Sequence, residues 1–451
     1  MIQAWTGRLL HIEPDRLQRI LAISLPIIGG MLSQSVINLI DAAMVGRLGD
    51  QALAAVGIGS YAAFIMVSLV MGISSAVQSL VARRQGAGDT KRLNEPFMAG
   101  LQLAVVFSIP LSLLLILAAP VLIPLLTDDP EVAAIAVPYF QWRAAALIAV
   151  AMNFVYRGFW AGIGETRFYL RILLIMHLAN VAISYLLIFG MGSWEGVGPV
   201  GSGMGTAVSL VLGSGLYTWL TFRRQRHRLG NISLPNRTTL RQLITLAGPN
   251  SLQQTLFAFG ISVFFWIIGQ ISTQAHAIGH ILISLQLLLI LPAVGMGIAS
   301  TSLVGHALGA GKPTDAHRSG WEVVRVTILI MLILGAPLWM FPEAILTVFT
   351  NDPQLIELGV LPLRLTGLVI LLEVTAMVLT QALLGAGASK QVMRINLLMQ
   401  WCVLLPLAYL IGPVAGFGLL GVWILQGLQR IVLSLIYSLI WQRRQWTSLI
   451  H

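Results

Sequence analysis

The chain has 451 residues, of which 57% are hydrophobic and only 10% charged, and its formal net charge is +10. Soluble globular proteins are about 45–50% apolar, so this composition excludes a soluble enzyme or binding domain. The positive charge does not indicate nucleic-acid binding, because basic residues that face an anionic inner leaflet are usual in membrane proteins.

Residues 1–17 form an amphiphilic start that contains Trp5, Arg8, His11 and Glu13. A signal peptide has a basic start, an apolar run and a small-residue cleavage site, and this segment does not follow that pattern. We interpret residues 1–17 as a cytoplasmic segment at the membrane surface.

Twelve apolar stretches follow, and each has about 20 or more residues, enough to cross a hydrocarbon core of about 30 Å as a helix. They lie near residues 18–46, 52–82, 95–126, 132–161, 168–191, 203–222, 243–269, 275–308, 324–349, 354–384, 391–412 and 418–441. The sequence therefore predicts an all-α polytopic membrane protein with twelve transmembrane helices.

Residues 26–164 and 249–387 are two copies of one segment, at a constant offset of 223 residues. The matched pieces include Pro26 and Pro249, the loops 86–88 and 309–311, the turns 127–130 and 350–353, and the glycine-containing loops 162–164 and 385–387. Each half of the chain holds six of the twelve stretches, and six is an even number, so both halves run in the same direction across the membrane. A duplicated polytopic unit of this kind is typical of transporters, whose substrate sites lie near the bilayer midplane.

The loops predict the orientation and the domain limits. Alternate loops are rich in Lys and Arg, which collect on the cytoplasmic side, so we expect both termini in the cytoplasm. The only long polar stretch, 223–241, is expected to be a cytoplasmic linker. It separates an N-lobe of helices 1–6 (residues 18–222) from a C-lobe of helices 7–12 (residues 242–442), and residues 443–451 form a cytoplasmic C-terminus.

The sequence has no nucleotide-binding loop, no zinc-ligand spacing and no soluble domain, so we expect transport driven by an ion gradient rather than catalysis. The single cysteine, Cys402, lies within helix 11 and can form no disulfide within the chain. His177, His280 and His306 are interpreted as packing or loop-edge groups rather than ligands.

Ionisable residues inside membrane helices are rare and are retained mainly where they function. Asp41 is such a residue in helix 1, although a surface carboxylate paired with Arg47 is the alternative interpretation. The second copy has Phe264 at the corresponding position. Pro26 lacks a backbone N–H and its ring clashes with the preceding turn, so helix 1 is expected to have a hinge there.

Four segments together resemble the multidrug and toxic compound extrusion (MATE) family, in particular its DinF-like branch. They are 38–49, 86–89, 157–166 and 186–190. The resemblance covers essentially the whole chain. It implies a V-shaped pair of pseudo-symmetric six-helix lobes and a bacterial inner-membrane antiporter that expels amphiphilic, often cationic compounds in exchange for protons or sodium ions.

The resemblance also implies a polar ion site in the N-lobe, which maps onto Asp41, Asn180, Ser184 and Thr206. Asn180 and Ser184 are one helical turn apart and share a face. Ser184 stands where the branch usually has a second carboxylate. One buried carboxylate suffices to bind a proton, because burial favours the neutral form, whereas a sodium ion prefers more charge. We therefore expect proton coupling, with sodium as the alternative. Asn180 and Ser184 have a second interpretation, as residues that pack membrane helices together.

Glu373 in helix 10 is the second embedded acid, at a position where other branches of the family have an Asp. Those branches also have a Glu in helix 7, where this chain has Phe257. Arg430 in helix 12 needs a partner if it is buried, and Glu373 is the candidate. The pair is either structural or part of the coupling mechanism.

These pieces predict a secondary active multidrug efflux antiporter with Asp41 as the coupling carboxylate. The residues expected to bind a cationic substrate are Gln34, Asn38, Asp41, Asn153 and Asn180. We expect a monomer in the lipid bilayer with no metal, no cofactor and no nucleic-acid partner. The alternatives are a sodium-coupled exporter of the same family and a lipid-linked precursor flippase of the wider superfamily.

Overall fold

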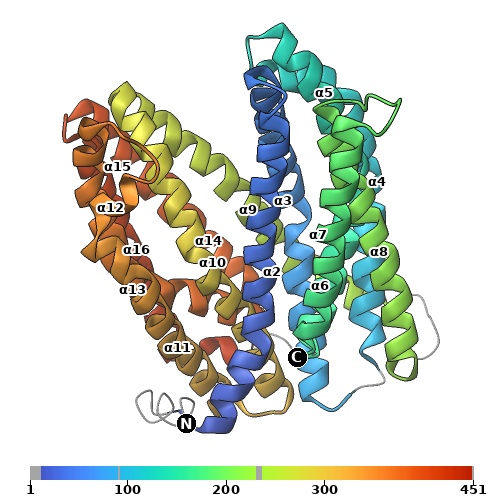
Figure 1. The fold of residues 1–451 in the computed structure, drawn as a ribbon. Coiled ribbons are helices and arrows are strands. Elements are labelled where there is room, and N and C mark those ends of the chain that lie inside the picture. The colour runs from blue at the N-terminus through green and yellow to red at the C-terminus, as the bar shows by residue number, and fades with distance from the viewer. Residues whose placement is uncertain (1–11, 90–91, 230–235, 449–451) are drawn as a thin grey trace. The chain divides into compact units, whose positions relative to one another are not determined.

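The structure is a computed structural model that describes residues 12–89, 92–229 and 236–448. Within these ranges the regular structure is helical, apart from one isolated bridge between Met191 and Trp194 (Figure 1). Residues 1–11 of the predicted surface segment and 230–235 of the predicted linker lie outside the described residues. The described chain contains ten helices long and apolar enough to cross a membrane, and a bent pair makes an eleventh.

The first repeat begins with two long helices and continues with a helix that ends in a 3-10 turn, a bent pair and two further helices. They are α2 (Pro14–Gly46), α3 (Asp50–Gly86), α4 (Asn94–Leu122) with η2 (Ile123–Leu126), α5 (Pro130–Ala145), α6 (Leu147–Gly162), α7 (Thr166–Phe189) and α8 (Val200–Leu229). The axes of α5 and α6 differ by 45° at Ala146. Helix α8 is not among the ten candidate spans, because glycine, serine and threonine dilute its apolar residues.

The second repeat has the same order with local differences. Its helices are α9 (Arg237–Gly269), α10 (Thr273–Gly309), α11 (Pro313–Met340), α12 (Pro342–Leu346), α13 (Pro353–Gly385), α14 (Ser389–Leu397), the π-helical η3 (Leu398–Leu404), α15 (Leu405–Tyr409), the π-helical η4 (Leu410–Val414), α16 (Gly418–Arg443) and η5 (Gln445–Ser448). The predicted limits of span 324–349 were wrong, because its first turns are charged and only the structure shows that those charges are paired.

The duplication is preserved in the helix ends. Helices α2 and α9, and likewise α3 and α10, begin and end at positions 223 residues apart. The repeated turn is a helix cap in both copies: Asp129 accepts a hydrogen bond from the backbone N–H of Glu131, and Asp352 accepts one from Gln354, both at 2.9 Å. An N-terminal cap of this kind satisfies backbone N–H groups that have no partner within the helix. The repeated sequence therefore encodes the same local structure twice.

The chain forms two compact units, and their boundaries fall inside helices. One unit is Gly29–Thr255, and the other combines the start of the chain, up to Ile28, with Leu256–His451. The crossings lie inside α2 shortly after Pro26 and inside α9 shortly after Pro249. The predicted lobes 18–222 and 242–442 follow the repeats, whereas these units exchange the first parts of α2 and α9.

In the 29–255 unit, the first part of α9 packs on α3 and α4. Thr255 accepts a hydrogen bond from Ser68 at 3.0 Å, and Asn250 donates one to Ser75. A Cβ added to Gly72 would lie only 2.4 Å from the backbone oxygen of Ala247, so α3 can approach α9 this closely only with glycine at that position. An aromatic core around Phe97, Tyr156, Phe159 and Trp160 supports these helices.

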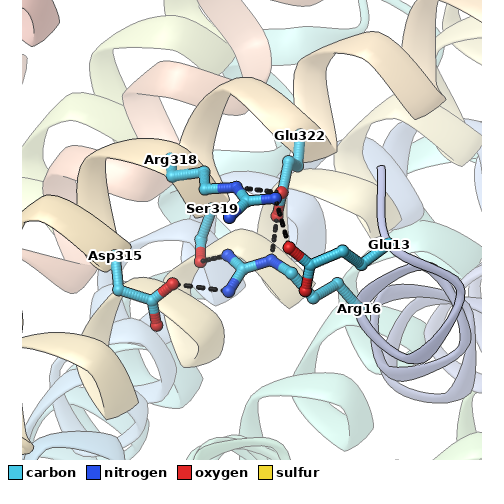
Figure 2. Close-up of polar contacts among 6 residues, drawn as sticks. All are labelled: Glu13, Arg16, Asp315, Arg318, Ser319 and Glu322. Atoms are coloured by element: carbon cyan, nitrogen blue, oxygen red, sulfur yellow. Dashed lines mark hydrogen bonds and ion pairs between the residues drawn. The ribbon is translucent and has the colours of Figure 1, made fainter. Parts of the chain in front are cut away.

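In the other unit, the first part of α2 packs on α10 and α11. The contact includes five charged residues and one serine that we call the Glu322 cluster: Glu13, Arg16, Asp315, Arg318, Ser319 and Glu322 (Figure 2). The carboxylate of Glu322 accepts from Arg16 Nε at 2.7 Å and from Arg318 Nε at 2.8 Å. Arg16 also contacts Asp315 at 2.5 Å, and its side chain donates to Ser319 at 3.0 Å. Further along, Ile28 lies against Gly295 of α10.

Candidate functional site

Asp41 lies on the face of α2 that is buried in the 29–255 unit. Three residues one turn from it on the same face, Ile37, Met44 and Val45, are buried. The Oδ1 atom of Asp41 is itself buried and has no hydrogen-bond partner. The ion pairs found between described residues do not include a pair with Arg47. The structure therefore gives no support to the alternative of a solvated, Arg47-paired carboxylate.

The contacts between α2 and α7 place Asp41 along the length of α7. Around the middle of both helices, the hydroxyl of Ser33 contacts His177 Nδ1 at 2.9 Å. Near their ends, Ile188 packs in one hydrophobic cluster with Met44 and Ile40. The two helices run in parallel at the same rise per residue, so Asp41 lies at the level of Ser184.

Asn180, Ser184 and Thr206 form one polar cluster between α7 and α8, which we call the α7–α8 cluster and extend to Ser202 and Ser209. Asn180 Nδ2 donates to Thr206 Oγ1 at 3.1 Å and to Ser209 Oγ at 3.4 Å. A Cβ on Gly205 would lie 2.2 Å from Ser184 Oγ, so the two helices are in tight contact beside Ser184. The structure thus brings the three predicted neutral members of the ion site together.

Several oxygens at this level have unsatisfied hydrogen-bonding capacity. Asn180 Oδ1, Ser184 Oγ and Ser202 Oγ are buried without a hydrogen-bond partner, as is Asp41 Oδ1. Leaving a buried polar group unsatisfied costs about 1–3 kcal/mol. One carboxylate and neutral oxygens of this kind can bind a proton or coordinate a hard cation such as sodium, which takes oxygen ligands as calcium and magnesium do.

The other predicted substrate residues lie along α2 and on α6. Gln34 donates to Asn38 Oδ1 at 3.1 Å and accepts from His177 Nε2 at 3.2 Å, so these side chains form a line along α2 that leads towards Asp41. Asn153 is different, because its amide donates to Leu210 O and accepts from Ser214. Both polar atoms of Asn153 hold α6 against α8.

Glu373 and Arg430 are in direct contact in the other unit. Arg430 NH1 donates to Glu373 Oε2, and both side chains are largely buried. With its amide oxygen turned towards Arg430, Gln286 accepts from the same guanidinium at 2.9 Å. Phe264, the counterpart of Asp41, is buried against Trp423. The two repeats have therefore diverged from each other at these positions.

Sequence reasoning missed three polar residues of the membrane helices: Arg143, Arg157 and Gln286. Arg157 donates to Ser74 Oγ at 3.0 Å and lies over the ring of Phe154 at 4.8 Å. Arg143 lies on α5 and acts electrostatically on Asp41. The signal was present, since an arginine inside the predicted span 132–161 meets the same criterion that singled out Arg430.

The fold and the site together define a duplicated, polytopic membrane protein with an unpaired carboxylate inside its first helix. The family model for MatE matches residues 26–186 and 249–410, which is most of the chain. The chain therefore belongs to the MatE family, and the protein is a transporter of this family rather than an enzyme.

Named relatives and solved structures agree with this assignment. The chain is 25% identical over 416 residues to the probable multidrug resistance protein NorM of Thermotoga maritima, covering 91% of this chain and 89% of the relative. It is 27% identical to the multidrug resistance protein PmpM of Pseudomonas aeruginosa, covering 94% and 90%.

A solved multidrug resistance MATE family transporter of the MOP superfamily, in an outward-facing conformation, superposes with a TM-score of 0.88 at 22% identity, covering 96% of this chain and 97% of that one. A MOP superfamily transporter from Pyrococcus furiosus has a TM-score of 0.87 at 22% identity, with coverage of 95% and 96%. These structures have the same fold as this chain.

Proposed function

We propose that the protein is a secondary active multidrug efflux antiporter that exports amphiphilic, cationic compounds in exchange for protons. The observation that carries the proposal is Asp41, whose partly buried carboxylate has no ion-pair partner within 4 Å and has one buried oxygen, Oδ1, without a hydrogen bond at the level of the α7–α8 cluster. An unpaired carboxylate in an apolar helix is costly for folding and is retained where it binds and releases charge. The relatives named for multidrug resistance support drug-like substrates.

The mechanism follows from competition for one carboxylate. Deprotonated Asp41 holds the cationic group of a substrate, with Asn180, Gln34 and Asn38 supplying hydrogen bonds. A proton from outside neutralises Asp41, the electrostatic attraction is lost, and the substrate leaves outward. Each ligand shifts the equilibrium only by its different affinity for the two states, so proton and substrate must weaken each other's binding. Asn153, whose amide also joins α6 to α8, is the fifth proposed substrate residue.

Pro26 is the proposed hinge in this cycle. Two residues after Pro26, helix α2 leaves one compact unit and enters the other. A change in the direction of the helix at Pro26 can therefore alter the position of Asp41 without breaking either unit. We propose that Glu373 and Arg430 are structural, since the guanidinium is bound by a carboxylate and an amide within one unit.

Sodium coupling is the second candidate, and one observation favours it. The unsatisfied oxygens of Asn180, Ser184 and Ser202 add three neutral ligands to the Asp41 carboxylate. The contact between Asn180 and Thr206 also supports assignment to the DinF-like branch, in which the resemblance places both residues at the ion site.

The proposal includes the inner membrane as location, both termini in the cytoplasm, and a monomer. Cys402 is the only cysteine, so Cys402→Ser gives a cysteine-free chain for testing orientation. Single cysteines in loops 86–89 and 309–312 should be shielded from an impermeant maleimide in intact cells, and those in loops 127–130 and 350–353 should react.

The coupling test uses purified protein in liposomes, with an imposed pH gradient or an imposed sodium gradient as the only driving force. We expect the pH gradient alone to drive uptake of a cationic dye such as ethidium, and Asp41→Asn to abolish it with an unchanged melting temperature. Transport driven only by sodium would replace the proton with the alternative ion. Coupled transport by Asp41→Asn at the rate of the unmodified protein would rule out Asp41 as the coupling group.

A further inference from the structure

Arg143 is a charged residue of the 29–255 unit that the proposed mechanism does not use. It follows Ala136 by seven positions and Tyr139 by four on α5, so it shares a helix face with both. Ala136 and Tyr139 are 0% and 2% exposed. Arg143 therefore lies on the buried face of α5.

Tyr139 shows where that face points. A Cβ on Gly59 of α3 or on Gly203 of α8 would lie 2.4 Å and 2.9 Å from the Tyr139 ring. The hydroxyl of Tyr139 contacts Ser60 at 2.8 Å. The same ring belongs to the hydrophobic cluster that contains Met44 of α2 and Ile188 of α7. The Tyr139 face of α5 is thus directed between α2, α3, α7 and α8.

The direction of α5 places Arg143 at the level of Asp41. Gln51, just after the end of α2, donates to Glu131 at the start of α5 at 2.7 Å, so α5 runs back along α2 in the opposite direction. One turn beyond Tyr139, which is level with Met44, Arg143 reaches the level of Asp41 and Ser184. The charge of Arg143 acts on the Asp41 carboxylate from there.

Arg143 has no fixed partner, unlike two other arginines of the membrane helices. Arg430 is paired with Glu373, and Arg157 is held by Ser74 and Phe154. Arg143 takes part in none of the ion pairs found between described residues. A charged side chain at this depth is costly and marks a functional site by default, and Asp41 is the carboxylate at its level.

When Asp41 is occupied by a proton or by a cationic group, the positive charge of Arg143 is no longer balanced. An anionic group on the bound molecule would restore the balance, and guanidinium binds carboxylates in a planar two-point geometry. We propose that Arg143 is a specificity-determining residue that gives the Asp41 site an anion-binding subsite, so that zwitterionic amphiphiles carrying a carboxylate are substrates. This inference rests on the proposed efflux function.

Two dyes that differ by one group provide the test. Tetramethylrhodamine methyl ester is a cation, and tetramethylrhodamine with its free carboxylate is a zwitterion with the same ring system. Initial transport rates are measured in liposomes for the unmodified protein, Arg143→Gln, Arg143→Lys and the control Arg171→Gln, which removes an exposed arginine of α7. We expect Arg143→Gln to lower the rate for the free acid at least tenfold and to leave the ester within twofold. Arg143→Lys should retain part of the free-acid rate, and Arg171→Gln should change neither rate.

Equal loss of both dyes in Arg143→Gln, or no loss of either, would overturn the subsite. If the unmodified protein transports neither dye, the efflux proposal fails but the subsite can still be tested. Fluorescence anisotropy in detergent then compares the binding of the free acid and of the ester to the unmodified protein and to Arg143→Gln. If Arg143→Gln does not fold, the subsite is tested with the unmodified protein alone. Benzoate should then inhibit free-acid transport far more strongly than ester transport, and equal inhibition contradicts the proposal.

Discussion

Asp41 could be chosen from sequence because it is an acid within a span that is otherwise apolar, whereas Asn180 and Ser184 were chosen through the resemblance to the MATE family. What the sequence does not contain is the spatial relation between α2, α7 and α8, and therefore which polar groups satisfy one another. Asn153 was expected to bind substrate, and the structure shows that its amide bonds to Leu210 and Ser214. Residue type predicts that a group needs a partner, whereas only the packing determines which partner it has.

Ser184→Asp tests the ion site at the scale of one residue. It places a second carboxylate at the level of Asp41, and two like charges in a low-dielectric interior are costly unless a cation lies between them. We therefore expect dye transport to become stimulated by sodium, measured in liposomes with and without a sodium gradient. Ser184→Asn is the matched control, because it has nearly the same volume and no charge. If Ser184→Asp and Ser184→Asn respond to sodium in the same way, the larger side chain pressing on Gly205, and not the added charge, explains the change in transport.

At the scale of elements, the hydrophobic pattern predicted most helices, since helix length and apolar content are local properties. It did not predict that the first part of α2 packs with α10 and α11. It also placed the start of span 324–349 too late, because the residues before it are charged and the sequence does not show their partners. The Glu322 cluster satisfies those charges, and α11 therefore continues back to Pro313.

Glu322→Gln tests how firmly α2 is held. The side chain of Glu322 is 3% exposed and binds two arginines, and removing one partner of a buried pair costs about 3 kcal/mol or more. We expect faster amide hydrogen exchange over residues 12–28, measured by mass spectrometry on protein in lipid nanodiscs. Glu343→Gln is the control, because the Glu343–Arg364 pair is exposed and such pairs contribute little. Unchanged exchange in Glu322→Gln would mean that apolar packing alone holds the segment.

At the scale of the whole molecule, the duplication predicted two equal halves, and the structure shows two compact units that each need part of the other half. The 29–255 unit includes the first part of α9, and the second unit includes the first part of α2. Sequence similarity identifies what was copied but not which copy each segment packs against. The limits of a repeat and the limits of a folded unit are therefore different quantities in this protein.

A chain divided within residues 230–235 tests this interdependence. We expect residues 1–229 expressed alone to aggregate in detergent, because the first part of α2 has no α10 or α11 to bind, and we expect co-expression with the remaining segment to give a complex that purifies through a tag on either piece. Size-exclusion chromatography with fluorescence detection measures both. A monodisperse, thermally stable 1–229 segment would show that each repeat folds by itself.

The contact between Arg16 and Glu322 joins residues separated by 306 positions, and this separation has a consequence for synthesis of the protein. Ribosomes add about 5–20 residues per second, so roughly 15 to 60 s pass between the emergence of Arg16 and that of Glu322. During that interval the first helix is already made, and the surface to which its start binds does not yet exist. Insertion into the membrane can proceed helix by helix, but assembly of this transporter cannot finish in the order of translation. The first turns of α2 remain exposed to chaperones and proteases until α11 has been synthesised.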